Sequence, residues 1–363
     1  LVQPSPRFEA VLRQGRPALR WSARAARQDI DLEVVREYTL DPGRRALRVH
    51  TRVTNRGRAV RDVATGFVLG WGGVRPFAPG VGQEDKDFRA EAPWVGWAAE
   101  GLAMAWAAEG SGNTLRLHFT VERHDALSHP GPVEATHAPV GLGPGATFND
   151  HSALFLSPGD LATVSRAVSL ARGEALGDVR VRVYGERFDS ADNTPRITVA
   201  TERGEAVTLA DAPRGLGFLS LPPGRYEAWA ALPGHALSES ASFEVTPGAT
   251  GSVPVTLTIP KGGILRVDAR DADADRPLPV RVVVRGVAPT RDPNLGPAHS
   301  GRGAGTVVIA PTGRVDIDVP PGKYAVTVSH GPEWTLDTQD VTVTETLRGE
   351  VTARLRRAVA MQS

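Results

Sequence analysis

The sequence contains no cysteine, and only two methionines and three lysines among its 363 residues. Without cysteine, disulfide bonds and cysteine-based metal sites are excluded. Nearly all basic residues are therefore arginines. The 42 basic and 41 acidic residues give a net charge of +1. A balanced charge argues against a nucleic-acid-binding surface, and we expect no nucleic-acid partner.

Long apolar stretches are also missing. No run approaches the roughly 18 residues that a membrane-spanning helix needs, so we expect no transmembrane segment. The chain begins with Leu1 rather than methionine. We interpret it as a processed, exported protein of the periplasm, the cell surface or the extracellular space, with an internal piece of a longer protein as the alternative.

Glycine (39) and proline (29) are abundant, which favours many short elements joined by turns. A chain of 363 residues is longer than a single domain with one hydrophobic core usually is. We therefore predict three tandem β-domains, a large one over residues 1–177 and two smaller ones over residues 178–260 and 261–363.

The first domain shows strand patterns. In "REYTLDPGRRALRVHTRVTNRG", a strand ends at Leu40, a turn follows at Asp41-Pro42-Gly43, and alternate apolar positions begin at Leu47. Alternation with period two around such a turn predicts a β-hairpin. The stretch "LATVSRAVSLARG" (161–173) suits a short helix capped at Ser157, but its all-β surroundings favour a strand.

The second and third domains are an internal repeat. "LPPGRYEAWAALPGHALSESASFEVTPG" starts at Leu221, and "VPPGKYAVTVSHGPEWTLDTQDVTVTET" starts at Val319. Each has an apolar residue, Pro-Pro-Gly, a basic residue and Tyr, and then alternating strands. Pro-Pro-Gly makes a tight turn, after which we expect the Tyr to enter the core. The repeat predicts two copies of one small β-sandwich module.

These motifs resemble known families. The Pro-Pro-Gly-basic-Tyr motif with its strand resembles the carboxypeptidase-regulatory-like fold, a transthyretin-like sandwich. In the first domain, "EYTLDPGRRALRVHTRVTN" and "WGGVRPFAPGVG" are similar to the galactose-mutarotase-like supersandwich. The predicted fold is therefore all-β, with a large supersandwich-like domain followed by two transthyretin-like modules.

The third domain also resembles the region before the catalytic domain of CehA/McbA-type metallohydrolases, which belong to the PHP (polymerase and histidinol phosphatase) group. The features that carry this resemblance are Arg285-Gly286, Asp292-Pro293, Gly331-Pro332-Glu333-Trp334 and Leu355-Arg356-Arg357. In that family, a D-x-H-x-H motif follows and opens a metal-binding barrel. The resemblance implies a divalent-metal-dependent hydrolase on the C-terminal side of Ser363, either as a further domain or as a partner protein.

Within this chain, the sequence predicts no catalytic residue, metal ligand or cofactor site. Five histidines crowd between positions 118 and 151, but their spacing matches no metal-binding motif: His118, His124, His129, His137 and His151. Carboxylates in "DARDADADRP" are candidate Ca²⁺ ligands: Asp268, Asp271, Asp273 and Asp275. The matching turn of the other copy carries Asp189 and Asp192, which favours a polar turn without a metal.

One loop, Gly70–Phe88, is long and rich in glycine and proline, and long ordered loops in β-domains are often functional. Its surroundings give a candidate surface for a ligand such as a polysaccharide, or for a partner: Trp71, Arg75, Phe77, Trp94 and Trp97. Trp94 and Trp97 are three positions apart and would face opposite sides of a strand. A role in the core is therefore the favoured interpretation for most of these rings.

We thus predict that the chain is a non-catalytic scaffold or docking region of an exported PHP-type hydrolase system. Any catalysis would belong to the full-length protein or to a partner. The alternative is a secreted carbohydrate-binding protein, or a cell-surface adhesion or assembly protein that forms homo-oligomers through its module edges.

Overall fold

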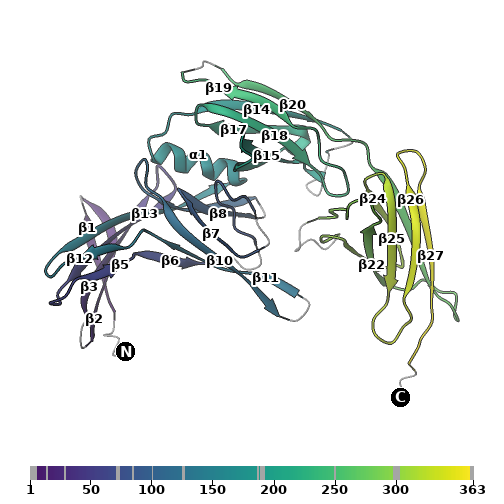
Figure 1. Ribbon diagram of the computed structural model, residues 1–363, viewed down its shortest axis with the longest axis horizontal. Coiled ribbons are helices and arrows are strands. Elements are labelled where there is room, and N and C mark those ends of the chain that lie inside the picture. Colours follow the sequence, from purple (N-terminus) through teal and green to yellow (C-terminus); the bar gives the residue numbers. More distant parts are fainter. Residues whose placement is uncertain are drawn as a thin grey trace.

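The computed structural model describes residues 6–359, except 14, 28–29, 71–73, 84–85, 100, 125–126, 186–187, 189–192, 249–250 and 297–302. This part of the chain is almost entirely β-structure, as predicted, and its only α-helix is α1 (Leu161–Ala171). The sheets form three groups that follow one another along an arch (Figure 1). No helix in the described ranges is long and apolar enough to cross a membrane.

The first group is a large sandwich. Its larger sheet has the order β1-β2-β3-β4-β13-β9-β8, with β1 (Arg7–Arg13), β2 (Arg16–Arg27), β3 (Ile30–Asp41), β4 (Ala46–Asn55), β13 (Thr147–Pro158), β9 (Leu102–Ala108) and β8 (Trp94–Ala99). The second sheet has the order β6-β11-β10-β7, with β6 (Gly66–Leu69), β11 (Leu127–Thr136), β10 (Leu115–His124) and β7 (Phe88–Ala92). β5 (Arg61–Val63) pairs with β12 (Val140–Leu142). The hairpin predicted around Asp41 is confirmed, because β3 and β4 pair antiparallel on either side of it.

The stretch from Leu161 to Ala171 forms helix α1, so the favoured strand interpretation was wrong. Leu161, Val164 and Val168 lie three and four positions apart, which places them on one face of a helix. All three are buried against the first sandwich. The cap is Asp160 rather than Ser157, since its carboxylate accepts a hydrogen bond from the Thr163 N–H at 3.0 Å.

The second group is a small sandwich. Its sheets are β17-β14-β20 and β16-β15-β18-β19, built from β14 (Gly177–Tyr184), β15 (Arg196–Thr201), β16 (Ala206–Asp211), β17 (Leu216–Leu221), β18 (Gly224–Ala231), β19 (Ala241–Val245) and β20 (Val253–Thr258), with a 3₁₀ turn at Pro213–Gly215. The central strand β14 pairs antiparallel with β17 and parallel with β20.

The third group repeats this arrangement. Its sheets are β24-β21-β27 and β23-β22-β25-β26, built from β21 (Gly263–Asp271), β22 (Val280–Gly286), β23 (Val307–Ala310), β24 (Arg314–Val319), β25 (Gly322–Ser329), β26 (Asp337–Val343) and β27 (Gly349–Leu355). β21 again pairs antiparallel with one neighbour and parallel with the other. The repeat seen in the sequence is therefore also a repeat of topology.

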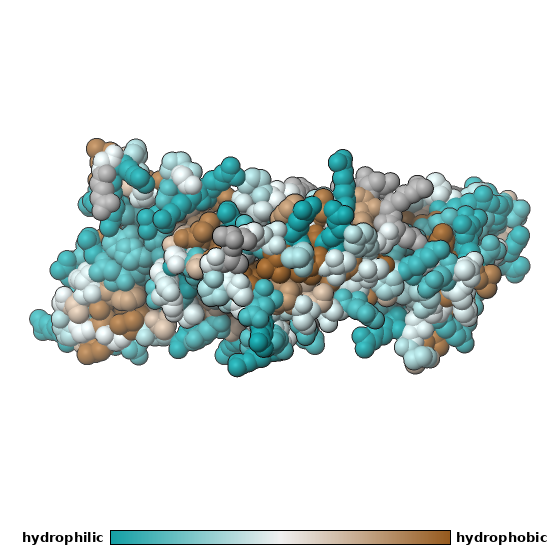
Figure 2. Space-filling view, turned by 90° about the horizontal axis from the view of Figure 1, so that it is seen from above, coloured by the Kyte–Doolittle hydropathy of each residue, from teal (hydrophilic) through white to brown (hydrophobic). Residues whose placement is uncertain are grey.

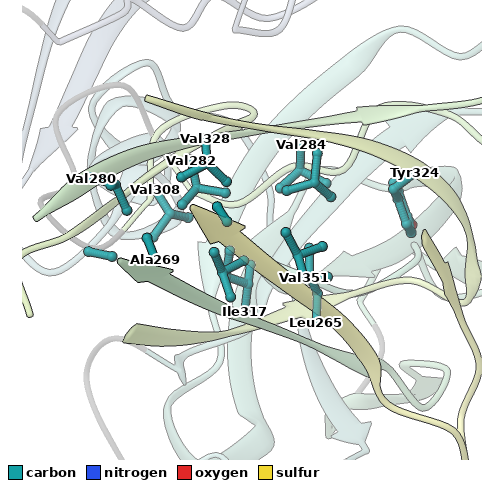
Figure 3. Close-up of a cluster of buried hydrophobic side chains, with 14 of the residues drawn as sticks. Leu265, Ala269, Val280, Val282, Val284, Val308, Ile317, Tyr324, Val328 and Val351 are labelled. Atoms are coloured by element: carbon teal, nitrogen blue, oxygen red, sulfur yellow. The ribbon is translucent and has the colours of Figure 1, made fainter. Parts of the chain in front are cut away.

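The shared motif has the same role in both copies. Tyr226 and Tyr324 enter their cores just after the Pro-Pro-Gly turns, as predicted, and both rings are buried. Their hydroxyls donate hydrogen bonds to the carbonyl oxygens of Pro222 (2.8 Å) and Pro320 (2.6 Å). In the third group, Tyr324 lies at one end of a row of valines and leucines between the two sheets (Figure 3). Each turn is thereby tied to its own core.

Candidate functional site

The predicted ligand surface falls mostly inside the protein. Phe77, Trp94 and Trp97 are only 0%, 3% and 2% exposed, whereas Arg75 is exposed and Trp71 lies outside the described residues. Trp94 packs with Phe77 on the α1 side of the large sheet, and Trp97 packs on its other side, between the two sheets. The described aromatic rings therefore contribute to the core rather than to an exposed platform.

The aspartates of the 268–275 turn are held by the protein itself. The Asp271 carboxylate accepts hydrogen bonds from the N–H groups of Asp273 (3.0 Å) and Ala274 (3.2 Å). The first of these bonds is the main cause that lowers the pKa of Asp271. Each of the other carboxylates has an arginine within 4 Å: Asp268 with Arg314, Asp273 with Arg356 and Asp275 with Arg354. Asp189 and Asp192 of the other copy lie outside the described residues.

In the described ranges, no three histidine or acidic side chains are placed to hold a metal ion together. His118, at a partly exposed position of β10, lies 3.5 Å from Glu134. The side chains of His124 and His129 are outside the described part.

A trio of one half-buried and two buried side chains combines the residue types of a hydrolase triad. His137 Nε2 lies 2.9 Å from both Asp150 Oδ1 and Ser152 Oγ. In a working triad, the carboxylate and the nucleophile contact different ring nitrogens, so that the base can move a proton between them. Here both share one nitrogen, and Ser152 is 3% exposed. The trio, with Thr65 donating to Asp150 at 2.8 Å, is a structural network.

A row of titratable side chains crosses the α1 side of the large sheet. Strand register places Glu37 on β3 beside His50 on β4, and His50 beside His151 on β13. The two imidazoles stack with ring centroids 4.4 Å apart and planes 11° apart. Glu37 Oε2 lies 3.7 Å from His50 Nδ1, Arg20 bonds to Glu37 at 2.8 Å, and Arg13 of β1 also contacts this carboxylate. We call Arg20, Glu37, His50 and His151 the charged row.

The surroundings of the charged row disfavour the protonated form of its two histidines, His50 and His151. Partial burial of the ring is the main cause that lowers the pKa of His50, which is half-buried, and also that of His151, whose residue is otherwise exposed. His50 lowers the pKa of His151 further. The hydrogen bond from His50 Nε2 to Asn149 Oδ1 (3.1 Å) acts in the opposite direction. Neutral imidazoles offer both donors and acceptors to a polar ligand. Sequence spacing missed this row, because His151 joins it only through the long-range pairing of β13 with β4.

Helix α1 joins the first sandwich to the second group. The helix packs on β9 and β13 of one and on β16 and β17 of the other. Asp160 Oδ2 also accepts a hydrogen bond from the Asp211 N–H of β16 at 2.7 Å. At the other end, the buried Arg172 donates to the carbonyl oxygens of Ala108 (2.8 Å) and Asn113 (3.0 Å). This joint is a packed interface rather than a free linker.

The second and third groups meet at the loop after β18. The Gly234 N–H donates to the carbonyl oxygen of Asn294 at 2.8 Å. The loop that carries Asn294 is shaped by Asp292, which accepts hydrogen bonds from Arg285 (2.6 Å) and from the Gly286 N–H (2.9 Å). Two of the motifs that carry the family resemblance therefore contact each other and support this joint.

The other two motifs hold the segment after β27. Glu333 pairs with Arg357 at 2.9 Å, and its carbonyl oxygen accepts the Ala358 N–H at 2.8 Å. Thr335 and Arg356 exchange two hydrogen bonds, at 2.9 and 3.0 Å. Residues 356–359 are thereby fixed to the third group.

No known family model matches this chain, and no curated protein does. Among solved structures, it is similar to the Bacillus anthracis TIE protein (14% identity, TM-score 0.22), covering 92% of this chain and 59% of that one. It is also similar to a galactose mutarotase-like protein from Clostridium acetobutylicum (8% identity, TM-score 0.31), covering 42% of this chain and 66% of that one. A third similar structure is the shaft pilin SpaA of Lactobacillus rhamnosus GG (11% identity, TM-score 0.31), covering 52% of this chain and 100% of that one. The chain thus spans about three fifths of the Bacillus protein, and likeness at this level assigns no activity.

Proposed function

We propose that this chain is a non-catalytic β-scaffold that fixes the position of a PHP-type, metal-dependent hydrolase, either a further domain or a partner protein. The observation that supports this is the location of the resemblance motifs. Arg285-Gly286 and Asp292-Pro293 support the joint to the preceding module, and Gly331–Trp334 holds the segment that leaves β27. Because the third group is fixed at both of its ends, it would hold a hydrolase attached after β27 in a defined orientation relative to the second group.

The rest of the chain suits the same role. Helix α1 locks the first sandwich to the second group, and Gly234 locks the second to the third. A hydrolase attached after β27 would then stay at a fixed distance from a ligand or partner bound to the first sandwich. In this proposal, the divalent metal belongs to the hydrolase, and the system is exported.

The direct test uses the protein purified from its natural source. We expect an intact mass above 38.5 kDa, or a stable complex with a second protein, and a hydrolase activity that a chelator removes. A single 38.5 kDa species with no bound metal and no associated hydrolase would contradict the proposal.

The charged row favours a second candidate, a carbohydrate-binding role for the first sandwich. Neutral imidazoles and the Asn149 amide can exchange hydrogen bonds with sugar hydroxyls. A glycan array should then give hits with the unmodified protein that are lost with His151→Ala and kept with His118→Ala. An array without hits, or hits unchanged by His151→Ala, would exclude this row as the binding site.

A further inference from the structure

Within the described part of the chain, no further strand pairs with one edge of the large sheet. Strand β8 ends the sheet on one side and is covered by Phe77, whose backbone exchanges two hydrogen bonds with Gly96, at 2.8 and 2.9 Å. On the other side, β1 is the last strand among the described residues. An edge strand presents a row of backbone N–H and C=O groups that can pair with another strand.

The sheet beside this edge is also apolar on one face. Large side chains on β1 to β3 are exposed: Phe8 (63%), Leu12 (76%), Leu19 (45%) and Leu40 (70%). The register places Ala10, Leu19 and Tyr38 side by side, and Tyr38 packs into the core between the two sheets. The apolar face therefore continues the core face beyond the second sheet. Hydrophobic side chains are visible at this end of the molecule (Figure 2, left).

The hairpin fixes which backbone groups point outward. Only two positions separate Arg13 from its partner Arg16. In a hairpin closed by two residues, the flanking pair exchanges both hydrogen bonds, and the pattern then alternates along the strand. Odd-numbered residues from Arg7 to Arg13 thus bond to β2. Phe8, Ala10 and Leu12 direct their N–H and C=O groups to the open edge.

Of the registers that pair at least five residues of β1 (Arg7–Arg13) with a second copy of the strand, one is favourable. Pairing through the outward groups allows Ala10 opposite Ala10, but this places Arg7 opposite Arg13. It also allows Glu9 opposite Glu9, and both arrangements set like charges together. With Val11 opposite Val11, each Glu9 faces the other copy's Arg13, and Leu12 faces Ala10. Glu9 and Arg13 are both partly accessible, with 56% and 39% of their side chains exposed.

We propose that two copies of this chain associate by antiparallel pairing of their β1 strands, with Val11 opposite Val11 across the two-fold axis. The two large sheets become one continuous sheet. Two Glu9–Arg13 ion pairs lie on the charged-row side, because Glu9 is the neighbour of Arg20 in the β1–β2 register. On the other side, each Leu12 packs beside Ala10 and diagonally beside Phe8 of the other copy.

The absence of cysteine makes the register directly testable. Val11 would lie in a non-hydrogen-bonded pair with Cα atoms about 4.5 Å apart, within the range for a disulfide. Val11→Cys should therefore cross-link to a dimer under mild oxidation. Val68→Cys, on the exposed end strand β6, should stay monomeric. Glu9→Cys and Arg13→Cys should cross-link to each other in a mixture more rapidly than either cross-links to itself.

Sedimentation of the unmodified protein provides the independent measurement. We expect a concentration-dependent species of twice 38.5 kDa, and its loss in Ala10→Pro, which removes an outward N–H without touching the β1–β2 bonds. Circular dichroism would show that this variant still folds. A monomer at every concentration, or a dimer in which Val11→Cys cross-links no faster than Val68→Cys, would overturn the proposal. Neither result depends on an attached hydrolase.

Discussion

Gly234 and Asp318 come from different modules and lie so close that no side chain fits between them. A Cβ atom at Gly234 would lie 2.8 Å from the Asp318 Cβ and 2.9 Å from its carbonyl carbon, and closer still to its carbonyl oxygen. Gly234 also has φ +78°, a left-handed conformation that glycine adopts without strain. The angle between the second and third groups therefore depends on this glycine.

The first prediction is that Gly234→Ala loosens this joint. The backbone of Asp318 cannot move aside cheaply, so the loop must shift and the hydrogen bond to Asn294 is lost. We expect a broader distance distribution by pulsed electron paramagnetic resonance, between one spin label on β18 and one on β25. Gly248→Ala is the matched control, because Gly248 has φ +68° and nothing within 4 Å of its Cβ position. Equally narrow distributions in both variants would contradict the prediction.

The second prediction concerns the other joint. Asp160→Ala removes the cap of α1 and the acceptor for the Asp211 N–H. Loss of a helix cap alone costs about 1 kcal/mol, and an unpaired N–H adds to this, so we expect the free energy of unfolding to fall by about 2 kcal/mol. Urea denaturation would measure this. The free energy of unfolding of Asp160→Asn should lie between those of the unmodified protein and Asp160→Ala, since the one amide oxygen can accept from only one of the two N–H groups.

The control for Asp160 is the exposed Asp62, whose replacement by Ala should change the free energy of unfolding by less than about 0.5 kcal/mol. If Asp160→Ala is no more destabilising than Asp62→Ala, the joint does not depend on this carboxylate.

Local patterns predicted much of this fold. Period-two alternation and turn residues identified the β3–β4 hairpin, and the Pro-Pro-Gly-basic-Tyr motif identified two modules whose tyrosines do enter their cores. Helix α1 was missed because its neighbours in the sequence are strands. The tertiary contacts of Leu161 and Val168 with the first sandwich favour the helix, and these are not visible in a local pattern.

The candidate site was harder to predict than the fold. Trp94 and Trp97 were correctly expected on opposite faces of a strand, and the favoured core role is confirmed for both, since both are buried. The charged row brings together Glu37, His50 and His151, which are up to 114 positions apart. The predicted β3–β4 hairpin brings Glu37 beside His50. The pairing of β4 with β13 joins strands far apart in the sequence, and a strand's distant partner is not encoded in its own residues.

The third prediction is a loss of stability on acidification that depends on the charged row. The pKa values of His50 and His151 are lowered in the folded state, from 6.5. Above about pH 6.5, both states are neutral; below it, the unfolded state binds protons first, so the free energy of unfolding falls as pH falls. Urea denaturation from about pH 8 to about pH 5 should show a shallower decline in the double variant His50→Gln and His151→Gln.

His118→Gln, at a partly exposed position of β10 outside the charged row, is the control variant for this prediction. If the double variant follows the unmodified protein, the two imidazoles do not contribute to the acid sensitivity.

The last prediction tests the module motif through Tyr324. Tyr324→Phe removes the hydrogen bond to the Pro320 carbonyl, and we expect a loss of about 1 kcal/mol at pH 7, with a similar loss for Tyr226→Phe. Burial raises the pKa of Tyr324 from 10.0 to about 12, so the unfolded state loses this proton first. The free energy of unfolding should therefore fall as pH rises from about 10 toward about 12, and less steeply in Tyr324→Phe. Tyr184→Phe, at a half-exposed position, is the control. Equal pH dependence in Tyr324→Phe and Tyr184→Phe would contradict the raised pKa of Tyr324, and an unchanged free energy of unfolding at pH 7 in Tyr324→Phe would contradict the role of its hydrogen bond.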